Sequence, residues 1–213
     1  MKKVSIILAI SLLVIFLSSC LKTLYPIFTE EDIVYNPDLL GRWQPEKKEG
    51  TDQSNLIITN LADEKSLELP GNVSSIKQKG YFISYESPDG SVKEQYIAFL
   101  ARIGKHLYFD YYPLEKQEKK VDEFFLAHFV KVHTSYRVDI SGDGSFELSQ
   151  LDEGHLTKLI NEKKFRIKHE KDENGDIMII TASTQELQQY LIKYGDDPEA
   201  YRSDKTKFSK INL

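Results

Sequence analysis

The stretch VKEQYIAFLARIGKHLYFDYY (Val92–Tyr112) decides the fold, because it holds two strand patterns joined by a tight turn. Both runs are rich in the β-branched and aromatic residues that favour strands. Gly104 opens a two-residue loop between them, and glycine at that place is typical of a hairpin. The hairpin predicts antiparallel pairing in which Phe99 lies opposite Asp110.

Further strand patterns occur on both sides of this hairpin, and turn residues separate them. Three turns carry Asp-Gly or Asn-Gly, the pairs that hairpins favour where φ is positive: SPDGS (87–91), SGDGS (141–145) and DENGD (172–176). The other candidate strands are SNLIITNL from Ser54, EKSLELP from Glu64, SSIKQ from Ser74, YFISYE from Tyr81, AHFVKVHTSYRVDI from Ala127, GSFEL from Gly144, FRIKHE from Phe165 and DIMIITA from Asp176. About ten short strands with such turn signals predict a mostly β (α+β) domain, a single antiparallel barrel or sandwich.

Two helices are expected among the strands, near residues 152–162 and 184–194. In the first, apolar residues recur on one face and Asp152 can cap the N-terminus. In the second, Ser183 and Glu186 form a capping box and Gly195 ends the helix. No repeat or low-complexity linker divides the chain, so a single β-rich globular domain is expected over 37–213.

One face of the predicted hairpin suggests a binding site. Tyr108, Asp110 and Tyr112 alternate along one strand and therefore share a face. In the strand from Ala127, His128 has the parity of the apolar residues and is expected to point inward. A carboxylate among aromatic rings must find hydrogen bonds or shift its pKa, and both outcomes occur at binding sites. We therefore take these four residues as candidate ligand-binding residues; the alternatives are that tyrosine hydroxyls satisfy Asp110 within the core, or that this face is open to solvent.

The N-terminus has the layout of a secretory signal. Lys2 and Lys3 precede an apolar run over 4–17, which is short for a membrane span of about 20 residues. The next residues resemble the lipobox of bacterial lipoproteins, an aliphatic residue, two small residues and a cysteine: Leu17, Ser18, Ser19 and Cys20. The resemblance implies a signal peptide over 1–19 and lipidation of Cys20, the only cysteine of the chain. An uncleaved anchor helix and a buried structural cysteine are the alternatives.

The lipobox resemblance also implies a location. Two or three acyl chains hold a protein stably on a bilayer, whereas one chain holds it marginally. In lipoproteins of diderm bacteria, an aspartate after the cysteine often retains the protein at the inner membrane, and Leu21 stands there instead. We therefore expect an outer-membrane lipoprotein, with residues 20–36 as a lipidated tether.

A helical turn followed by Gly41, Arg42 and Trp43 at the start of the first strand resembles the lipocalin and calycin family. In that family the tryptophan plugs the closed end of an up-and-down barrel whose open end holds a small apolar ligand. Trp43 is accordingly expected to be a structural aromatic plug. The family also stacks an arginine from its last strand on this tryptophan, whereas DIMIITA, the last strand expected here, has none.

Neither the charge balance of the chain nor the spacing of its chemically reactive residues indicates nucleic-acid binding or catalysis. The chain has 28 Lys and Arg against 33 Asp and Glu, a net charge of −5, so it lacks a basic nucleic-acid footprint. The histidines lie in different predicted elements or on opposite faces, and DENGD lacks the glycine and glutamate of a calcium loop. No nucleophile has a base at motif spacing, and no cofactor fingerprint occurs. We expect no metal, no cofactor and no enzymatic activity.

Two functions remain. The first is binding of a small apolar or amphipathic ligand in an aromatic pocket, with Asp110 and His128 as polar handles, and it predicts a cavity of several hundred cubic ångströms. The second is a filled domain that docks an envelope protein partner, and it predicts an exposed apolar patch.

Overall fold

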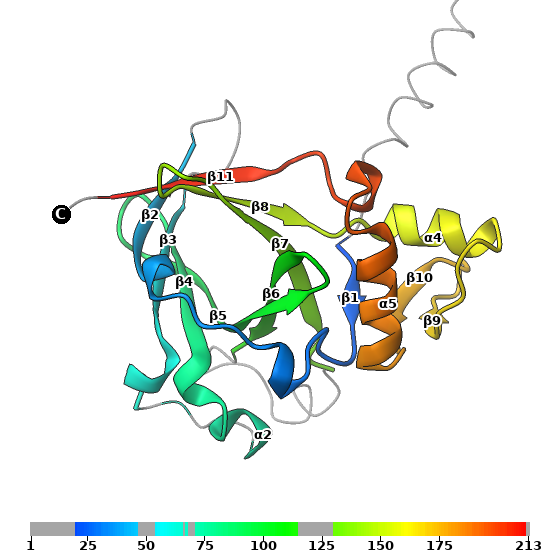
Figure 1. The fold of residues 1–213 in the computed structure, drawn as a ribbon, viewed down its shortest axis with the longest axis horizontal. Helices are drawn as coiled ribbons and strands as arrows, with labels where there is room; N and C mark the ends of the chain where they lie inside the picture. The colour runs from blue at the N-terminus through cyan, green and yellow to red at the C-terminus, as the bar shows by residue number, and fades with distance from the viewer. Residues whose placement is uncertain (1–19, 47–53, 66, 68–70, 115–129, 212–213) are drawn as a thin grey trace, which may run out of the picture.

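Eight antiparallel strands form a closed barrel. The computed structural model describes residues 20–46, 54–65, 67, 71–114 and 130–211. The barrel strands follow the order β2-β3-β4-β5-β6-β7-β8-β11, and β11 pairs with β2 to close the ring (Figure 1). Their bounds are β2 Gly41–Pro45, β3 Asn55–Asn60, β4 Gly80–Glu86, β5 Val92–Ile103, β6 His106–Pro113, β7 His133–Ile140, β8 Phe146–Gln150 and β11 Thr206–Lys210. The predicted fold class is thus confirmed, and the ring of pairings decides for a barrel over a sandwich.

The hairpin over 92–112 forms as its sequence predicts. β5 and β6 pair antiparallel with Phe99 opposite Asp110, and Gly104 lies in the loop at φ 59°. The glycines of the three Asp-Gly and Asn-Gly turns also have positive φ, between 82° and 86°. A residue with a Cβ atom is strained in that conformation, so these glycines fix where the hairpins reverse.

One strand prediction was wrong, and two others lie partly outside the described residues. SSIKQ was predicted as a strand from Ser74 but is helical at both ends. Ser74 is the last residue of the short helix α2 (Gly71–Ser74), and Lys77 is the first residue of the 3-10 helix η5 (Lys77–Lys79). Most of EKSLELP, predicted as a strand from Glu64, lies outside the described residues; Glu64 and Lys65 follow the 3-10 helix η4 (Leu61–Asp63). Of the strand predicted from Ala127, the described residues form a strand from His133, and Val130, before it, is 65% exposed.

The last strand of the barrel is one that the sequence did not reveal. DIMIITA forms β10 (Ile177–Ile180), which lies outside the barrel and pairs with β9 (His169–Lys171) and with β1 (Lys22–Thr23). β11 follows it in the chain and joins β2 to β8.

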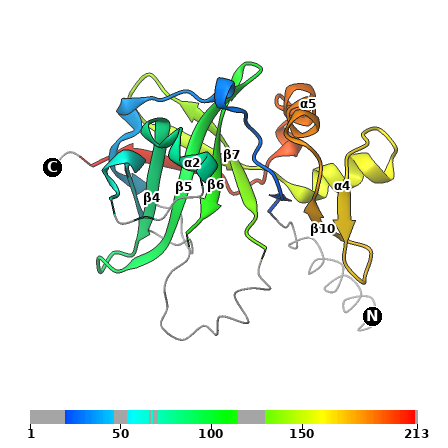
Figure 2. The same ribbon diagram turned by 90° about the horizontal axis from the view of Figure 1, so that it is seen from below.

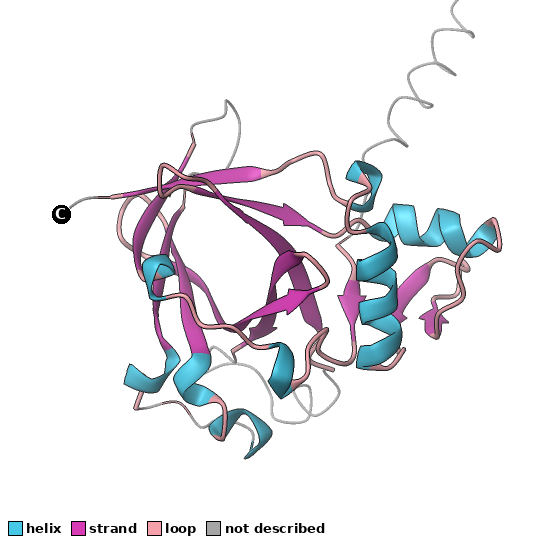
Figure 3. Cartoon of the chain, viewed as in Figure 1, coloured by secondary structure: helices cyan, strands magenta, loops and turns pink. Residues whose placement is uncertain are grey.

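Both predicted helices are confirmed, and they lie outside the ring of strands (Figure 3). α4 spans Glu153–Asn161, and Asp152 caps it by accepting the His155 N–H. α5 spans Thr184–Tyr194 and begins with the Ser183 and Glu186 capping box; a short 3-10 helix, η6 (Pro198–Ala200), follows. α4, α5 and β10 lie together at one side of the barrel (Figure 2). In the described part of the chain, no helix is long and apolar enough to cross a membrane.

Three apolar clusters hold the domain together. The first fills the barrel and includes Trp43, Tyr81 and Phe146. The second joins the outer face of β5 and β6 to α4, α5 and β10. The third covers the outer face of β5 around Ile97 and Phe99. The wall formed by β5 and β6 is therefore buried on both sides, which explains its nearly continuous run of apolar and aromatic residues.

The segment 20–36 differs from the expected tether. Leu21, Ile27 and Ile33 are at most 6% exposed, and β1 pairs with β7. The Val34 N–H donates to the Leu100 carbonyl at 2.8 Å. These apolar side chains cover the outer wall of the barrel, so the segment is part of the domain. It also contains the 3-10 helix η2 (Glu30–Asp32). The predicted signal peptide, 1–19, lies outside the described residues.

Candidate functional site

One end of the barrel interior is filled by aromatic and aliphatic side chains. Trp43 is 1% exposed and donates its indole N–H to the Leu39 carbonyl at 2.9 Å. Leu39 ends the 3-10 helix η3 (Pro37–Leu39), and Phe146 packs edge-on against Trp43 with ring centroids 4.7 Å apart. Trp43 therefore occupies the place expected of a core-closing aromatic.

The last strand does supply a cation above this tryptophan. The Lys210 ammonium lies 5.2 Å from the Trp43 ring centroid, within the range of a cation–π contact. It also donates to the Asp38 carbonyl at 3.1 Å. The prediction that DIMIITA is the last strand was wrong: the last strand is β11, which has no arginine either but places Lys210 over the tryptophan.

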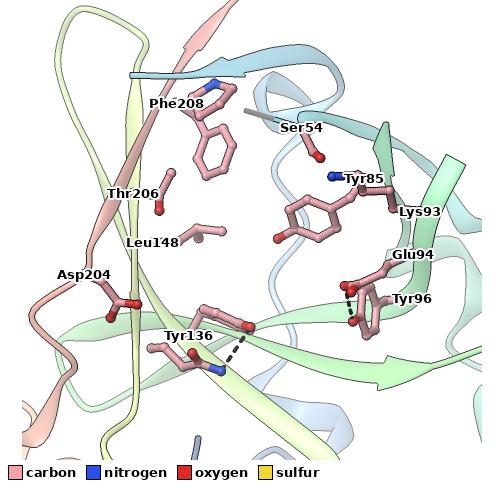
Figure 4. Close-up of a pocket in the computed structure, with 12 residues that line it drawn as sticks. Ser54, Tyr85, Lys93, Glu94, Tyr96, Tyr136, Leu148, Asp204, Thr206 and Phe208 are labelled. Carbon is pink, nitrogen blue, oxygen red and sulfur yellow. Dashed lines mark hydrogen bonds between the residues drawn. The ribbon is translucent and has the colours of Figure 1, made fainter. Parts of the chain in front are cut away.

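The other end of the interior opens into a cavity of about 300 Å³, the mouth cavity (Figure 4). Its walls come from β2, β4, β5, β7, β8 and β11, with Ser54 just before β3. The aromatic and aliphatic lining consists of Tyr85, Tyr96, Tyr136, Leu148, Phe208 and Pro45. The polar lining consists of Ser54, Lys93, Glu94, Gln150, Asp204 and Thr206. A ligand here would meet rings and aliphatic groups on some sides and hydrogen-bonding groups on others.

Hydrogen bonds orient the tyrosines of the mouth cavity. The Tyr96 hydroxyl donates to Glu94 at 2.7 Å, and Gln150 donates to the Tyr136 hydroxyl at 3.1 Å (Figure 4). The Tyr85 and Tyr111 hydroxyls lie 3.5 Å apart. The lining is thus arranged by contacts within the protein itself.

Burial keeps these phenols neutral. It raises the pKa of Tyr85 to about 12. Burial and the neighbouring Tyr85 hydroxyl raise the pKa of Tyr111 and Tyr136. A neutral phenol both donates and accepts a hydrogen bond, so the mouth cavity offers a ligand either partner near neutral pH.

Cys20 lies close to the rim of the mouth cavity, although it is not one of the lining residues. It forms a β-bridge with Asp152, two residues after Gln150 at the end of β8. The Arg202 N–H donates to the Gln150 carbonyl at 2.9 Å, which holds the chain beside Asp204 to the same rim. The predicted lipid attachment point and the mouth cavity are therefore neighbours.

The residues that the sequence singled out lie elsewhere. Tyr108, Asp110 and Tyr112 share one face of β6, as predicted, but it is the outer face of the barrel. Tyr108 is fully buried there, and its hydroxyl lies 3.0 Å from that of Tyr201. Asp110 and Tyr112 line a second cavity, outside the barrel. His128 lies outside the described residues.

Asp110 is buried with two partners, neither of them a tyrosine. One carboxylate oxygen accepts the Ile27 N–H at 2.9 Å, and the other pairs with Nδ1 of His133. His133 was not among the predicted site residues, although its position in the strand sets it opposite the apolar residues Tyr136, Val138 and Ile140. Tyr85, Tyr96 and Tyr136 were not predicted as site residues either, because alternation along a strand defines two faces without saying which one is interior.

In the described part of the chain, no three His, Cys, Asp or Glu residues gather where they could hold a metal ion. Comparisons with protein-family models, with curated proteins and with solved structures find no match. Functional inference therefore rests on the geometry of the cavities and on the sequence motifs.

Proposed function

We propose that this protein is a membrane-anchored lipoprotein of the bacterial envelope, without enzymatic activity, whose barrel binds a small apolar or amphipathic ligand in the mouth cavity. The observation that carries the proposal is the asymmetry of the barrel interior. Trp43, Leu39 and Phe146 fill one end, while the other end leaves about 300 Å³ open. Protein interiors are close-packed, and a void of this size reaches the lower range of ligand sites.

The lining selects the kind of ligand. Phe208, Leu148 and the rings of Tyr85 and Tyr136 offer an apolar surface, while Gln150 and other polar groups lie around it. Burying apolar area contributes roughly 25 cal/mol per Å². An amphipathic molecule fits both parts of this lining, because its apolar part can contact the rings while its polar part hydrogen-bonds to the polar groups.

The position of Cys20 supports a mouth that faces the membrane. Because residues 21–36 pack on the barrel, a lipid on Cys20 would be joined to the domain without a flexible spacer. The rim of the mouth cavity at Gln150 would then lie close to the bilayer surface. An amphipathic ligand could pass between the membrane and the mouth cavity over a short distance. Leu21 after the lipobox favours the outer membrane of a diderm bacterium.

The alternative is an interaction module without a ligand pocket. That alternative predicts a filled domain, whereas the structure has cavities of about 300 and 430 Å³. The cavities favour ligand binding over the interaction module.

Native mass spectrometry of the full-length protein tests the proposal. The protein would be purified gently from its host, reconstituted in phospholipid nanodiscs and ejected intact. We expect an added mass that fragments to a small apolar or amphipathic molecule. Thr206→Trp places an indole in the mouth cavity and should abolish the added mass.

Met178→Trp is the matched control. Met178 is 53% exposed on β10, outside the barrel, so the same indole there should leave the added mass unchanged. Thermal melting of each variant establishes that it is folded. An empty protein, or an added mass that Thr206→Trp leaves in place, would count against ligand binding in the mouth. A stoichiometric protein partner would favour the interaction module.

A further inference from the structure

The tyrosine hydroxyls of the mouth cavity differ in what they can offer to a ligand. Each phenol has one hydrogen to donate and an oxygen that accepts. Tyr96 donates its hydrogen to Glu94 at 2.7 Å, so this hydroxyl is turned towards that carboxylate (Figure 4). Tyr85 and Tyr136 line the same cavity, and the hydrogen bonds around them show where their hydrogens point.

Tyr136 has a hydrogen to offer. Its oxygen accepts from the side-chain amide of Gln150 at 3.1 Å, so its own hydrogen points elsewhere. None of the described residues accepts that hydrogen. Buried polar groups usually have a hydrogen-bond partner, and Tyr136 is half-buried in the cavity wall. A group inside the cavity is therefore best placed to accept it.

Tyr85 has a second hydrogen of this kind. Its hydroxyl lies 3.5 Å from that of Tyr111, and only one of the two hydrogens can be used between them. Tyr111 is 1% exposed, does not line the mouth cavity and has no other acceptor in the described part of the chain. If Tyr85 were the donor, the Tyr111 hydrogen would be buried without a partner, which is costly. Tyr111 therefore donates to Tyr85, and the Tyr85 hydrogen is left for the cavity.

The two hydrogens select the polar group of the ligand. A carbonyl oxygen has two lone pairs, so it accepts two hydrogen bonds and needs to donate none. An ammonium group only donates, and it would leave the hydrogens of Tyr85 and Tyr136 without an acceptor. A carbonyl therefore fits these two hydroxyls, and an amine does not.

The charges around the cavity do not favour an anion. Lys93 lines it together with Glu94 and Asp204, so the lining sums to one negative charge, and Arg202, which pairs with Asp204, brings the sum only to zero. Burial, and after it the charge of Glu94, raises the pKa of Tyr85 to about 12. A further negative charge beside this hydroxyl is disfavoured for the same reasons. An uncharged carbonyl group avoids that cost, whereas a carboxylate does not.

We propose that the ligand of the mouth cavity is an uncharged carbonyl compound with an apolar chain, a ketone or an ester. Its carbonyl oxygen accepts from the hydroxyls of Tyr85 and Tyr136, and its chain lies against Leu148 and Phe208. This inference rests on the proposed function and adds the chemical class of the ligand to it.

Photo-crosslinking with a matched pair of probes tests the inference on the full-length protein in nanodiscs. One probe is 2-octanone; the other is 2-methyl-1-octene, in which a CH₂ group of similar size replaces the carbonyl oxygen. Each carries a diazirine at the end of its chain, and 2-octanone without the diazirine is the competitor. We expect both probes to label the peptide that carries Leu148. At equal concentrations in the nanodisc lipid, the ketone should label it at least about fivefold more, the effect of two hydrogen bonds.

Phenylalanine variants separate the hydroxyls from the rings. Tyr85→Phe and Tyr136→Phe should each reduce labelling by the ketone about twofold to tenfold and leave labelling by the alkene unchanged. Tyr96→Phe is the matched control in the same cavity. Its hydroxyl is already bonded to Glu94, which is exposed to water, so the ratio of ketone to alkene labelling should stay the same. Thermal melting establishes that each variant is folded.

The infrared band of the carbonyl gives a readout that a change in packing alone would not move. 2-Octanone with carbon-13 at the carbonyl should absorb at a lower wavenumber when it is bound than in empty nanodiscs, because hydrogen bonds weaken the C=O bond. The shift should become smaller in Tyr85→Phe and in Tyr136→Phe and should persist in Tyr96→Phe.

Two sets of results would contradict the account, and they can be told apart. Equal labelling by ketone and alkene, an unshifted carbonyl band, or folded Tyr85→Phe and Tyr136→Phe variants that behave like the wild type would overturn the inference and leave ligand binding in the mouth intact. No labelling of the Leu148 peptide by either probe, or labelling that Thr206→Trp leaves in place, would overturn the proposed function and this inference with it.

Discussion

Tyr81→Phe is expected to destabilise the protein by an amount that depends on pH. Tyr81 is fully buried in β4, with its ring stacked on Tyr35 and edge-on to Phe109. Its hydroxyl accepts the Asn36 N–H at 2.7 Å and donates to the Asn36 carbonyl at 3.2 Å. It thereby fastens the chain before η3 to the barrel.

The neutral-pH cost follows from those two hydrogen bonds. Phenylalanine keeps the ring contacts but removes the hydroxyl that bonds both the N–H and the carbonyl of Asn36. A typical intramolecular hydrogen bond contributes roughly 0.5 to 1.5 kcal/mol net, so two give about 1 to 3 kcal/mol. Asn36 is half-buried, so water can hydrogen-bond to its backbone groups in the variant and offset part of the lost stability. We expect the free energy of unfolding to fall by about 1 to 2 kcal/mol at pH 7.

At alkaline pH, the stability advantage of the wild type over the variant becomes smaller. Burial raises the pKa of Tyr81 to about 12, against 10 in the unfolded chain. Between these values the unfolded chain releases a proton that the folded chain keeps, so Tyr81 stabilises fully below pH 10 and less as the pH rises towards 12. The loss for this one group is about 1.4 kcal/mol at pH 11. The variant has no such group, whereas all other tyrosines are common to both proteins.

Urea denaturation followed by far-UV circular dichroism at pH 7, 9, 10 and 11 measures both effects. The difference between wild type and variant should stay constant up to about pH 9 and then shrink by about 1.4 kcal/mol at pH 11. Equal stabilities at pH 7 would refute the role of the Asn36 hydrogen bonds. A difference that is constant through pH 11 would refute the raised pKa of Tyr81.

Three further substitutions test other parts of the account. Cys20→Ser should stop lipidation and move the protein out of the detergent phase in phase partitioning; a variant that stays membrane-bound would contradict the anchor. Lys210→Met removes the ammonium above Trp43 and should lower stability by about 0.5 to 1 kcal/mol in urea denaturation, whereas an unchanged midpoint would show that the contact contributes nothing. Ser149→Ala removes a hydroxyl that is buried without a hydrogen-bond partner among the described residues, so unfolding should cost the same or up to about 1 kcal/mol more; a clear loss of stability would reveal a missed partner.

The local elements could be predicted from the sequence because their signals are local. Gly104 and the Asp-Gly pairs place the hairpins, and Ser183 with Glu186 marks the start of α5. β11 was not predicted because TKFSK is short and two of its five residues are charged, and because its role depends on pairing with β2, more than 160 residues away along the chain. The segment 20–36 escaped because its buried residues have neither helical nor strand spacing.

The site could be predicted only in part, for a different physical reason. Asp110 was recognised as a carboxylate among aromatic residues, and the structure buries it beside Tyr112. Both faces of β5 and β6 are buried, one inside the barrel and one beneath the chain around it, so both faces carry aromatic residues. Alternation could not say that Tyr111 faces the interior and Asp110 does not. The partner of Asp110 proved to be His133, whose distance from it is set by the pairing of β6 with β7.

A crystal structure of the protein purified gently from its host is the most direct test of the central claim, that the barrel mouth holds a ligand. We predict continuous non-protein density between the rings of Tyr85, Tyr136 and Phe208, with a polar end among the hydrogen-bonding groups of the lining. A mouth cavity that contains only ordered water, or that has closed around its own side chains, would contradict the claim.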